Sequence, residues 1–123
     1  MDWLFRQDLP IYTQLMEQLT LAIIAGDYPA GARLPSVRDI ALEAGVNPNT
    51  VQRALSELER EGLIFSQRTA GRFVTEDIDG IERAKLRMAN EKAAEFLAAK
   101  QKLGFSRGEI PALLERIKEE QAT

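Results

Sequence analysis

Between Ser36 and Gly62 the chain carries the start and stop signals of two helices that only a very short turn can join. Ser36 can cap the first helix, because its hydroxyl can accept a hydrogen bond from a free backbone N–H of the first turn. Gly45 predicts the end of that helix, since the residue that leaves a helix often adopts a positive φ. Asn47 and Pro48 predict the second helix, with the asparagine as its cap and the proline at the first position, where no N–H is needed. So short a break restricts this stretch to two helices packed at a steep angle.

The apolar residues of this stretch recur at helical spacing and give each helix one inward face. They are Val37, Ile40, Ala41 and Ala44 in the first helix, and Val51, Ala54, Leu55 and Leu58 in the second. A further helix, from Pro10 to about Ala25, is predicted by the same spacing and by Gly26 after it. We expect a shared core of Leu15, Leu19, Ile23, Ile40, Val51, Leu55 and Leu58.

After Gly62 the periodicity changes from helical to alternating. Two short β-prone runs, residues 63–67 and 72–75, flank the loop Arg68-Thr69-Ala70-Gly71 and predict a β-hairpin. Gly71 can supply the positive φ that such a loop tends to require. A lone two-stranded ribbon is not stable in water, so we expect the hairpin to pack on the helices.

The outer face of the second helix is polar but not acidic. It carries Asn49, Thr50, Gln52, Arg53 and Ser56, and no acid of this helix precedes Glu57. Amides can bind adenine edges and arginine can bind guanine, while hydroxyls can contact several bases. A solvated surface is the alternative interpretation of such a face. The position of the acids after it favours insertion into the DNA major groove, with Arg68 and Arg72 of the hairpin reaching phosphate or the minor groove.

Four ordered segments resemble the GntR family of bacterial transcription regulators. They are Leu34-Pro35-Ser36-Val37-Arg38, Gly45-Val46-Asn47-Pro48-Asn49-Thr50-Val51, Leu58-Glu59-Arg60-Glu61-Gly62-Leu63-Ile64 and Gly71-Arg72-Phe73-Val74. The resemblance covers residues 9–74, and reaches the rest only through its length and helicity. The Asn-Pro-Asn-Thr-Val form and the short tail are similar to the YtrA subfamily.

The resemblance implies a mostly α fold with a small β-hairpin, a winged helix-turn-helix, in which Arg38 contacts phosphate and the second helix lies at the groove. The predicted DNA-binding residues are Ser36, Arg38, Asn47, Pro48, Asn49, Thr50, Gln52, Arg53, Arg68, Gly71 and Arg72. Many relatives have a basic residue at Pro48 and arginine at Gln52, so a different base preference is expected here. The wing also departs from the family, which usually has glycine at Thr69 and a small or hydroxyl residue at Arg72.

Residues 76–123 predict a second domain after a winged domain of residues 1–75. One helix is expected at residues 81–103, and Gly104 ends it. Ser106 and Glu109 form a capping-box pattern with Phe105 and Ile110 as a staple, although Pro111 indicates that the next helix starts nearer Glu109. We expect an antiparallel helical hairpin that forms a homodimer, through Ile81, Ala84, Met88, Phe96, Leu97, Leu103, Leu113, Leu114 and Ile117. The alternative is that the tail folds back on the winged domain.

Composition limits the other functions. The absence of cysteine and histidine excludes disulfides, thiol catalysis and the usual zinc sites. We therefore expect no metal, no cofactor and no enzyme, since no group of nucleophile, base and orienting residue is evident. No apolar run approaches a membrane span and residues 1–8 lack a signal-peptide pattern, so a cytoplasmic chain without a membrane partner is expected.

The charge of the chain is a poor match for a protein that coats DNA without specificity. The formal net charge is −3, whereas such proteins are basic. Residues 33–72 hold six arginines, at positions 33, 38, 53, 60, 68 and 72, against five acids, at 39, 43, 57, 59 and 61. Affinity for DNA must therefore come from the placement of charges.

The favoured function is a dimeric, sequence-specific transcriptional regulator that binds a palindromic DNA operator, with repression favoured over activation. A small-molecule effector stays possible, at the dimer interface or between tail and winged domain, because two helices enclose too little volume for a pocket of their own. A protein-interaction module without a DNA role is the second hypothesis.

Overall fold

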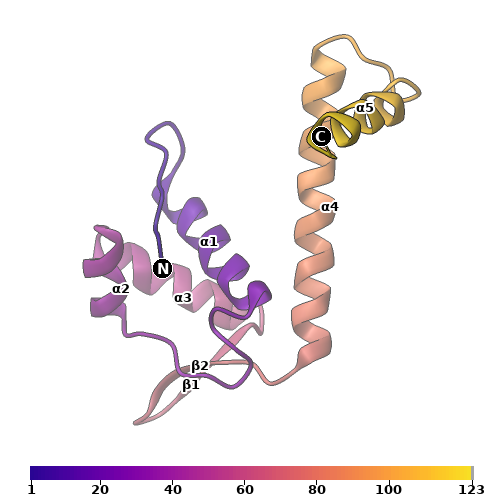
Figure 1. Ribbon diagram of the computed structural model, residues 1–123. Helices are drawn as coiled ribbons and strands as arrows, with labels where there is room; N and C mark the ends of the chain where they lie inside the picture. The colour runs from indigo at the N-terminus through magenta and orange to yellow at the C-terminus, as the bar shows by residue number, and fades with distance from the viewer. Residues whose placement is uncertain (123) are drawn as a thin grey trace. The chain divides into compact units, whose positions relative to one another are not determined.

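The computed structural model describes residues 1–122, which form five helices and one two-stranded antiparallel sheet (Figure 1). The helices are α1 (Ile11–Ala25), α2 (Val37–Ala44), α3 (Pro48–Arg60), α4 (Ile78–Lys102) and α5 (Ile110–Ala122), and the strands are β1 (Ile64–Gln67) and β2 (Gly71–Val74). The chain separates into two compact units, Met1–Lys85 and the residues from Leu86 onward, so the division falls inside α4. None of the helices described is long and apolar enough to cross a membrane.

Side chains fix both helices of the predicted helix-turn-helix at their starts. The Ser36 hydroxyl accepts a hydrogen bond from the Asp39 N–H at 3.1 Å, and the Asn47 Oδ1 accepts one from the Asn49 N–H at 2.8 Å. Gly45 ends α2 with a φ of 70°, and its N–H bonds to the Ala41 carbonyl. The caps and the turn predicted from the sequence are therefore confirmed.

The hairpin is paired from Ile64 opposite Val74 to Gln67 opposite Gly71. It is tighter than expected, because Gly71 belongs to β2 and only residues 68–70 form the loop. The linker before α2 runs along the outer edge of β2. There the Leu34 N–H donates to the Arg72 carbonyl at 2.9 Å, and the Val74 N–H donates to the Ala32 carbonyl at 2.9 Å. These bonds attach the wing to the linker that leads into the helix-turn-helix.

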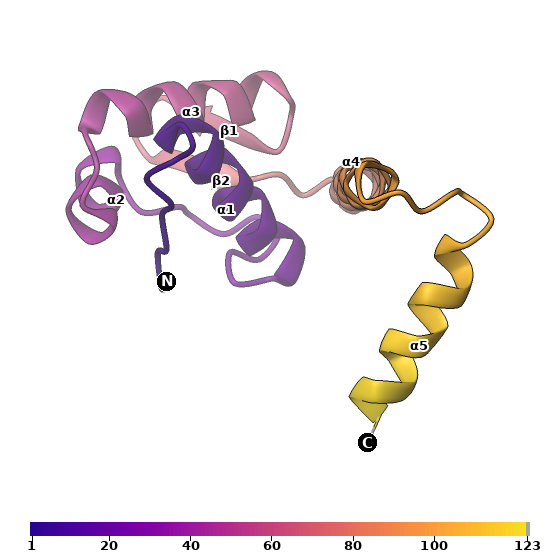
Figure 2. The same cartoon turned by 90° about the horizontal axis from the view of Figure 1, so that it is seen from above.

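The core of the first unit lies between the three N-terminal helices and the wing, and all seven predicted core residues are buried. Figures 1 and 2 show α1 and α3 side by side, and they are the most closely packed pair of helices in this unit. The first turns of α4 also take part. Ala84 is 3% exposed within the core cluster, and Ile81 packs against it.

The helix α4 begins at Ile78, whereas the sequence predicted a start at Ile81. Gly80 lies inside the helix and not before it, and the Ile81 N–H bonds to the Asp77 carbonyl at 3.1 Å. Acidic residues at the start of a helix interact favourably with its dipole, which offsets the weak helix propensity of glycine. This early start brings Ile81 and Ala84 to the core, so the first compact unit runs to Lys85 and not only to residue 75.

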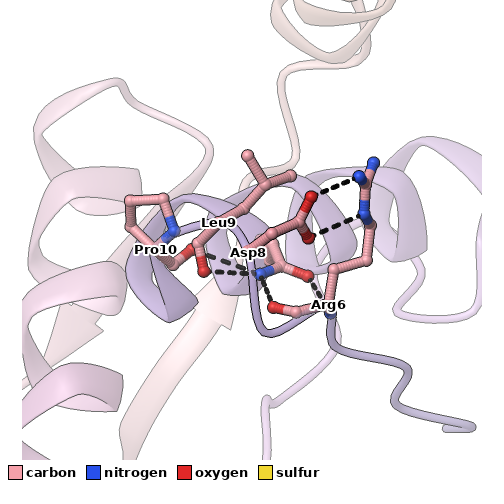
Figure 3. Close-up of polar contacts among 5 residues, drawn as sticks. Arg6, Asp8, Leu9 and Pro10 are labelled. Carbon is pink, nitrogen blue, oxygen red and sulfur yellow. Dashed lines mark hydrogen bonds and ion pairs between the residues drawn. The ribbon is translucent and has the colours of Figure 1, made fainter.

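The segment before α1 packs on its own unit. Gln14, which is 9% exposed, accepts a hydrogen bond from the Arg6 N–H at 2.6 Å. Its Nε2 donates to the carbonyls of Arg6 at 2.7 Å and Leu9 at 3.1 Å. Figure 3 shows this turn, where Arg6 is also paired with Asp8 at 2.6 Å. One buried side chain thus satisfies several backbone groups of the segment.

In the second unit, α5 begins at Ile110, as Pro111 indicated. The Ser106 N–H donates to the Glu109 carboxylate at 3.0 Å, which is half of the predicted capping box, and this bond lowers the pKa of Glu109. The tail has the two helices that the sequence predicted, although α5 does not lie alongside α4 as an antiparallel partner. Figure 2 looks along α4, and α5 lies across that view. Ile110 is the one residue of α5 that is buried in the part of the chain described, so little apolar contact holds the two helices side by side.

Candidate DNA interface

The polar residues predicted on the outer side of α3 lie together on its exposed face. Val51, Ala54, Leu55 and Leu58 on the opposite side are fully buried. Asn49, Gln52, Arg53 and Ser56 are exposed, and Thr50 is half-buried. The Gln52 Nε2 donates to the Ser56 hydroxyl at a long 3.4 Å, a bond that a base edge could replace.

The two helix-capping residues, Ser36 and Asn47, are also predicted DNA-binding residues, and their side-chain oxygens are already hydrogen-bonded within the protein. The Asn47 Oδ1 is engaged by the Asn49 N–H, which leaves the amide nitrogen of Asn47 as its free donor group. The Ser36 hydroxyl is engaged in the same way at α2. Arg38 in the first turn of α2 and Pro48 in the first turn of α3 are exposed. Each cap residue therefore orients its helix first and can contact DNA only with what remains.

Two of the acids that follow the polar face are engaged elsewhere. Glu57 forms an ion pair with Arg60, one turn further along α3. Glu59 accepts a hydrogen bond from the Ser66 hydroxyl of β1. These interactions hold negative charge at the C-terminal part of α3. Its first half is left to uncharged polar groups and Arg53.

An arginine that the sequence analysis did not single out lies against the wing. The backbone of Arg33 forms an antiparallel β-bridge with Phe73 of β2. The Arg33 side chain is exposed, and the guanidinium lies against Gly71. A Cβ at residue 71 would come within 3.2 Å of the Arg33 Nε. Arg68 is exposed in the hairpin loop, whereas Arg72 is half-buried and its Nε is enclosed with no hydrogen-bond partner among the residues described. Arg33 and Arg68 are therefore better placed than Arg72 to meet phosphate.

Gly71→Ala is expected to weaken binding to all DNA sequences alike, because the added Cβ would lie 3.2 Å from the Arg33 Nε and the guanidinium must move by a few tenths of an ångström. Residue 71 has a φ of 100°, which an alanine adopts only with strain. The substitution should therefore also lower the free energy of unfolding, by about 1–2 kcal/mol. Gly62→Ala is the matched control, with a φ of 83° but nothing within 4 Å of the new Cβ. Denaturant unfolding should show similar losses for both variants, and filter binding a loss for Gly71→Ala alone. Equal loss of DNA binding in both would rule out the contact with Arg33 as its cause.

A second residue missed from the sequence lies beneath Arg53. The Arg53 Cζ lies over the ring of Tyr12 in α1, 4.1 Å from the ring centroid. Tyr12 is half-buried and packs against the core cluster. From the sequence it was one aromatic residue at the start of a helix, and only the packing of α1 on α3 brings it against the exposed Arg53.

Comparison with known proteins agrees with this geometry. Residues 11–74 match the family described as bacterial regulatory proteins, gntR family. The HTH-type transcriptional repressor YtrA of Bacillus subtilis (strain 168) is 35% identical over 115 residues, which cover 93% of this chain and 86% of YtrA. A GntR family transcriptional regulator from Listeria monocytogenes has a similar structure, with a TM-score of 0.83 and 36% identity over 91% of this chain and 98% of the other.

A second similar structure contains an operator. AraR(DBD), solved in complex with operator ORX1, matches with a TM-score of 0.56 and 26% identity, over 61% of this chain and 96% of the other. The family match covers more than half of the chain, and YtrA matches nearly all of it. The chain therefore belongs to the GntR family and is a helix-turn-helix transcriptional regulator.

Proposed function

We propose that the protein is a homodimeric repressor that binds double-stranded DNA at an operator of two inverted half-sites. The observation that carries the proposal is the exposed face of α3, where Asn49, Gln52 and Arg53 stand together without an acid among them. The operator complex of AraR(DBD) supports DNA as the ligand. The name of YtrA supports repression, and the similarity to YtrA across the tail supports the same subfamily.

The residues divide by the kind of contact that their chemistry favours. Gln52 and Asn49 carry amides that can bind the adenine edge with two hydrogen bonds, and Arg53 can bind guanine in the same manner. Arg38, Arg33 and Arg68 carry the charge that phosphate contacts need, and they set the position of the protein on the duplex. Since the net charge is −3, these few contacts must supply most of the electrostatic attraction.

The proposed dimer interface lies in the tail. Met88, Phe96, Leu97, Leu113 and Ile117 are half-buried, while Leu103 is 70% and Leu114 40% exposed. Such apolar area outside a core is usually covered by another surface. Ile81 and Ala84, predicted to join this interface, are engaged in the core of their own unit. The proposal therefore rests on the residues from Met88 onward.

Two substitutions should separate base recognition from phosphate contact. Gln52→Ala is expected to relax base preference at one position of each half-site, at a cost of about 1–3 kcal/mol for the preferred base. Arg38→Ala should weaken all sequences alike and lower the slope of log affinity against log salt by about one unit per protomer. Both effects are measured by competition binding on single-base variants of a selected site, at several salt concentrations.

The assignment fails if Arg38→Ala changes base preference while Gln52→Ala changes nothing. A wild-type protein that shows no preference among duplexes at any salt concentration would favour the other candidate, a protein-interaction module.

A further inference from the structure

The contact between Arg53 and Tyr12 joins the recognition helix to a different helix. Tyr12 lies in the first turn of α1, near the predicted DNA-facing side only because α1 packs along α3. Its ring is held from below, since it is half-buried and packs against the core cluster. The Arg53 guanidinium carbon lies 4.1 Å from the ring centroid, well within the range of a cation–π interaction. An anchored ring thus supports an exposed side chain.

The geometry of this contact suits an arginine that must bind something else. A guanidinium placed over an aromatic ring uses its flat face, and its N–H donors point outward around the edge. The edge is the part that forms two parallel hydrogen bonds with guanine or with phosphate. The contact with Tyr12 and a contact with DNA are therefore compatible, and the first can precede the second.

Ordering also matters for the strength of binding. A long arginine side chain on an exposed helix face samples many rotamers, and fixing them opposes binding. Arg60, two turns further along the same face of α3, is held by Glu57, so the arginines of this face are ordered by two different partners. Arg53 is ordered by a neutral ring, which leaves its positive charge uncompensated.

We propose that Tyr12 is a positioning residue for DNA recognition, which holds the guanidinium of Arg53 in the orientation that reads its base. This inference rests on the proposed function, because it requires Arg53 to contact DNA. Tyr12 acts through Arg53 and needs no contact with DNA of its own.

The test compares Tyr12→Leu, Tyr12→Phe and Arg53→Ala in the full chain, with duplexes that vary one base at a time in the selected half-site. Tyr12→Leu keeps an apolar side chain in the core but removes the ring. It should reduce discrimination at the base read by Arg53 by about 2- to 30-fold, the range that corresponds to a cation–π interaction. Tyr12→Phe keeps the ring and should retain the wild-type preference.

A double-mutant cycle separates positioning from general stability. In the Arg53→Ala background, Tyr12→Leu should cause no further loss of discrimination, because the group that it positions is gone. Tyr12→Leu should lower the free energy of unfolding by the same amount in the wild-type and in the Arg53→Ala background, except for the energy of the contact between Tyr12 and Arg53. Denaturant unfolding of the four proteins measures these losses. Discrimination at the bases read by Gln52 should stay unchanged in every variant.

Each contrary outcome has a definite meaning. If Arg53→Ala changes base preference and Tyr12→Leu does not, the inference is wrong and the proposed function stands. If Tyr12→Phe loses as much as Tyr12→Leu, the ring is not the group responsible, and the inference is again wrong. If Arg53→Ala leaves recognition unchanged while Gln52→Ala relaxes it, Arg53 has no base to read and the role of Tyr12 falls with it.

Discussion

A chain cut after Lys85 is expected to bind its operator about 10²- to 10⁴-fold more weakly than the full chain, because two linked domains make the second binding event intramolecular. The cut belongs after Lys85 and not after residue 75, since Ala84 is part of the core of the first unit. The half-site preference should not change, because α3 and the wing are intact. Sedimentation should show a monomer, and circular dichroism should show that the helices of the first unit persist.

Substitutions in the full chain test the same claim without removing residues. Phe96→Glu combined with Leu97→Glu should imitate the truncation, since unpaired carboxylates in an apolar interface oppose association. Ala98→Glu is the control for the added charge, because Ala98 is exposed and lies two residues from Phe96, on the other side of α4. A truncated chain that stays dimeric with undiminished operator affinity would place the interface outside the tail.

Leu19→Ala is expected to lower the free energy of unfolding by about 2–5 kcal/mol, because it removes a large side chain from a closely packed core. Leu19 lies in α1 and is 0% exposed within the core cluster. A small domain is stabilised by only a few such residues, so the variant should be partly unfolded at moderate temperature. Chemical denaturation followed by circular dichroism measures the loss.

Leu42→Ala is the matched control for this prediction. It is the same substitution in another helix, α2, at a side chain that is 73% exposed. Its effect should stay within about 0.5 kcal/mol, as is usual for surface positions. Equal losses for the two variants would contradict the packing described here for the first unit.

Local chemistry explains why much of the fold could be predicted. Ser36, Asn47 and Gly45 have side-chain or backbone properties that fix helix ends whatever surrounds them, and the structure has those ends where the sequence placed them. The buried faces of α1 and α3 follow from the spacing of their apolar residues in the same way. The polar face of α3 is the complement of its buried face, so its exposure could also be predicted.

The features that were missed depend on contacts between segments far apart in the sequence. Arg33 lies against Gly71 because the linker pairs with β2, and Tyr12 lies under Arg53 because α1 packs on α3. No local pattern in the sequence marks either arginine contact. The core position of Ala84 depends on how α4 leaves the wing. Helical spacing predicts the apolar face of α5 but not the direction in which α5 leaves the turn after α4, and Ile110 is its one buried residue in the part described.

Selection of bound duplexes from a random DNA pool by the full-length protein tests the central claim most directly. The proposed function predicts enrichment of one motif with two inverted half-sites, whose centres lie about one helical turn or a multiple of it apart. The Gln52→Ala protein, selected in parallel, should enrich the same arrangement with one base position relaxed in each half. Recovery of no motif, or of the same motif by wild type and by a variant without the polar side chains of α3, would contradict the assignment of α3 as the recognition helix.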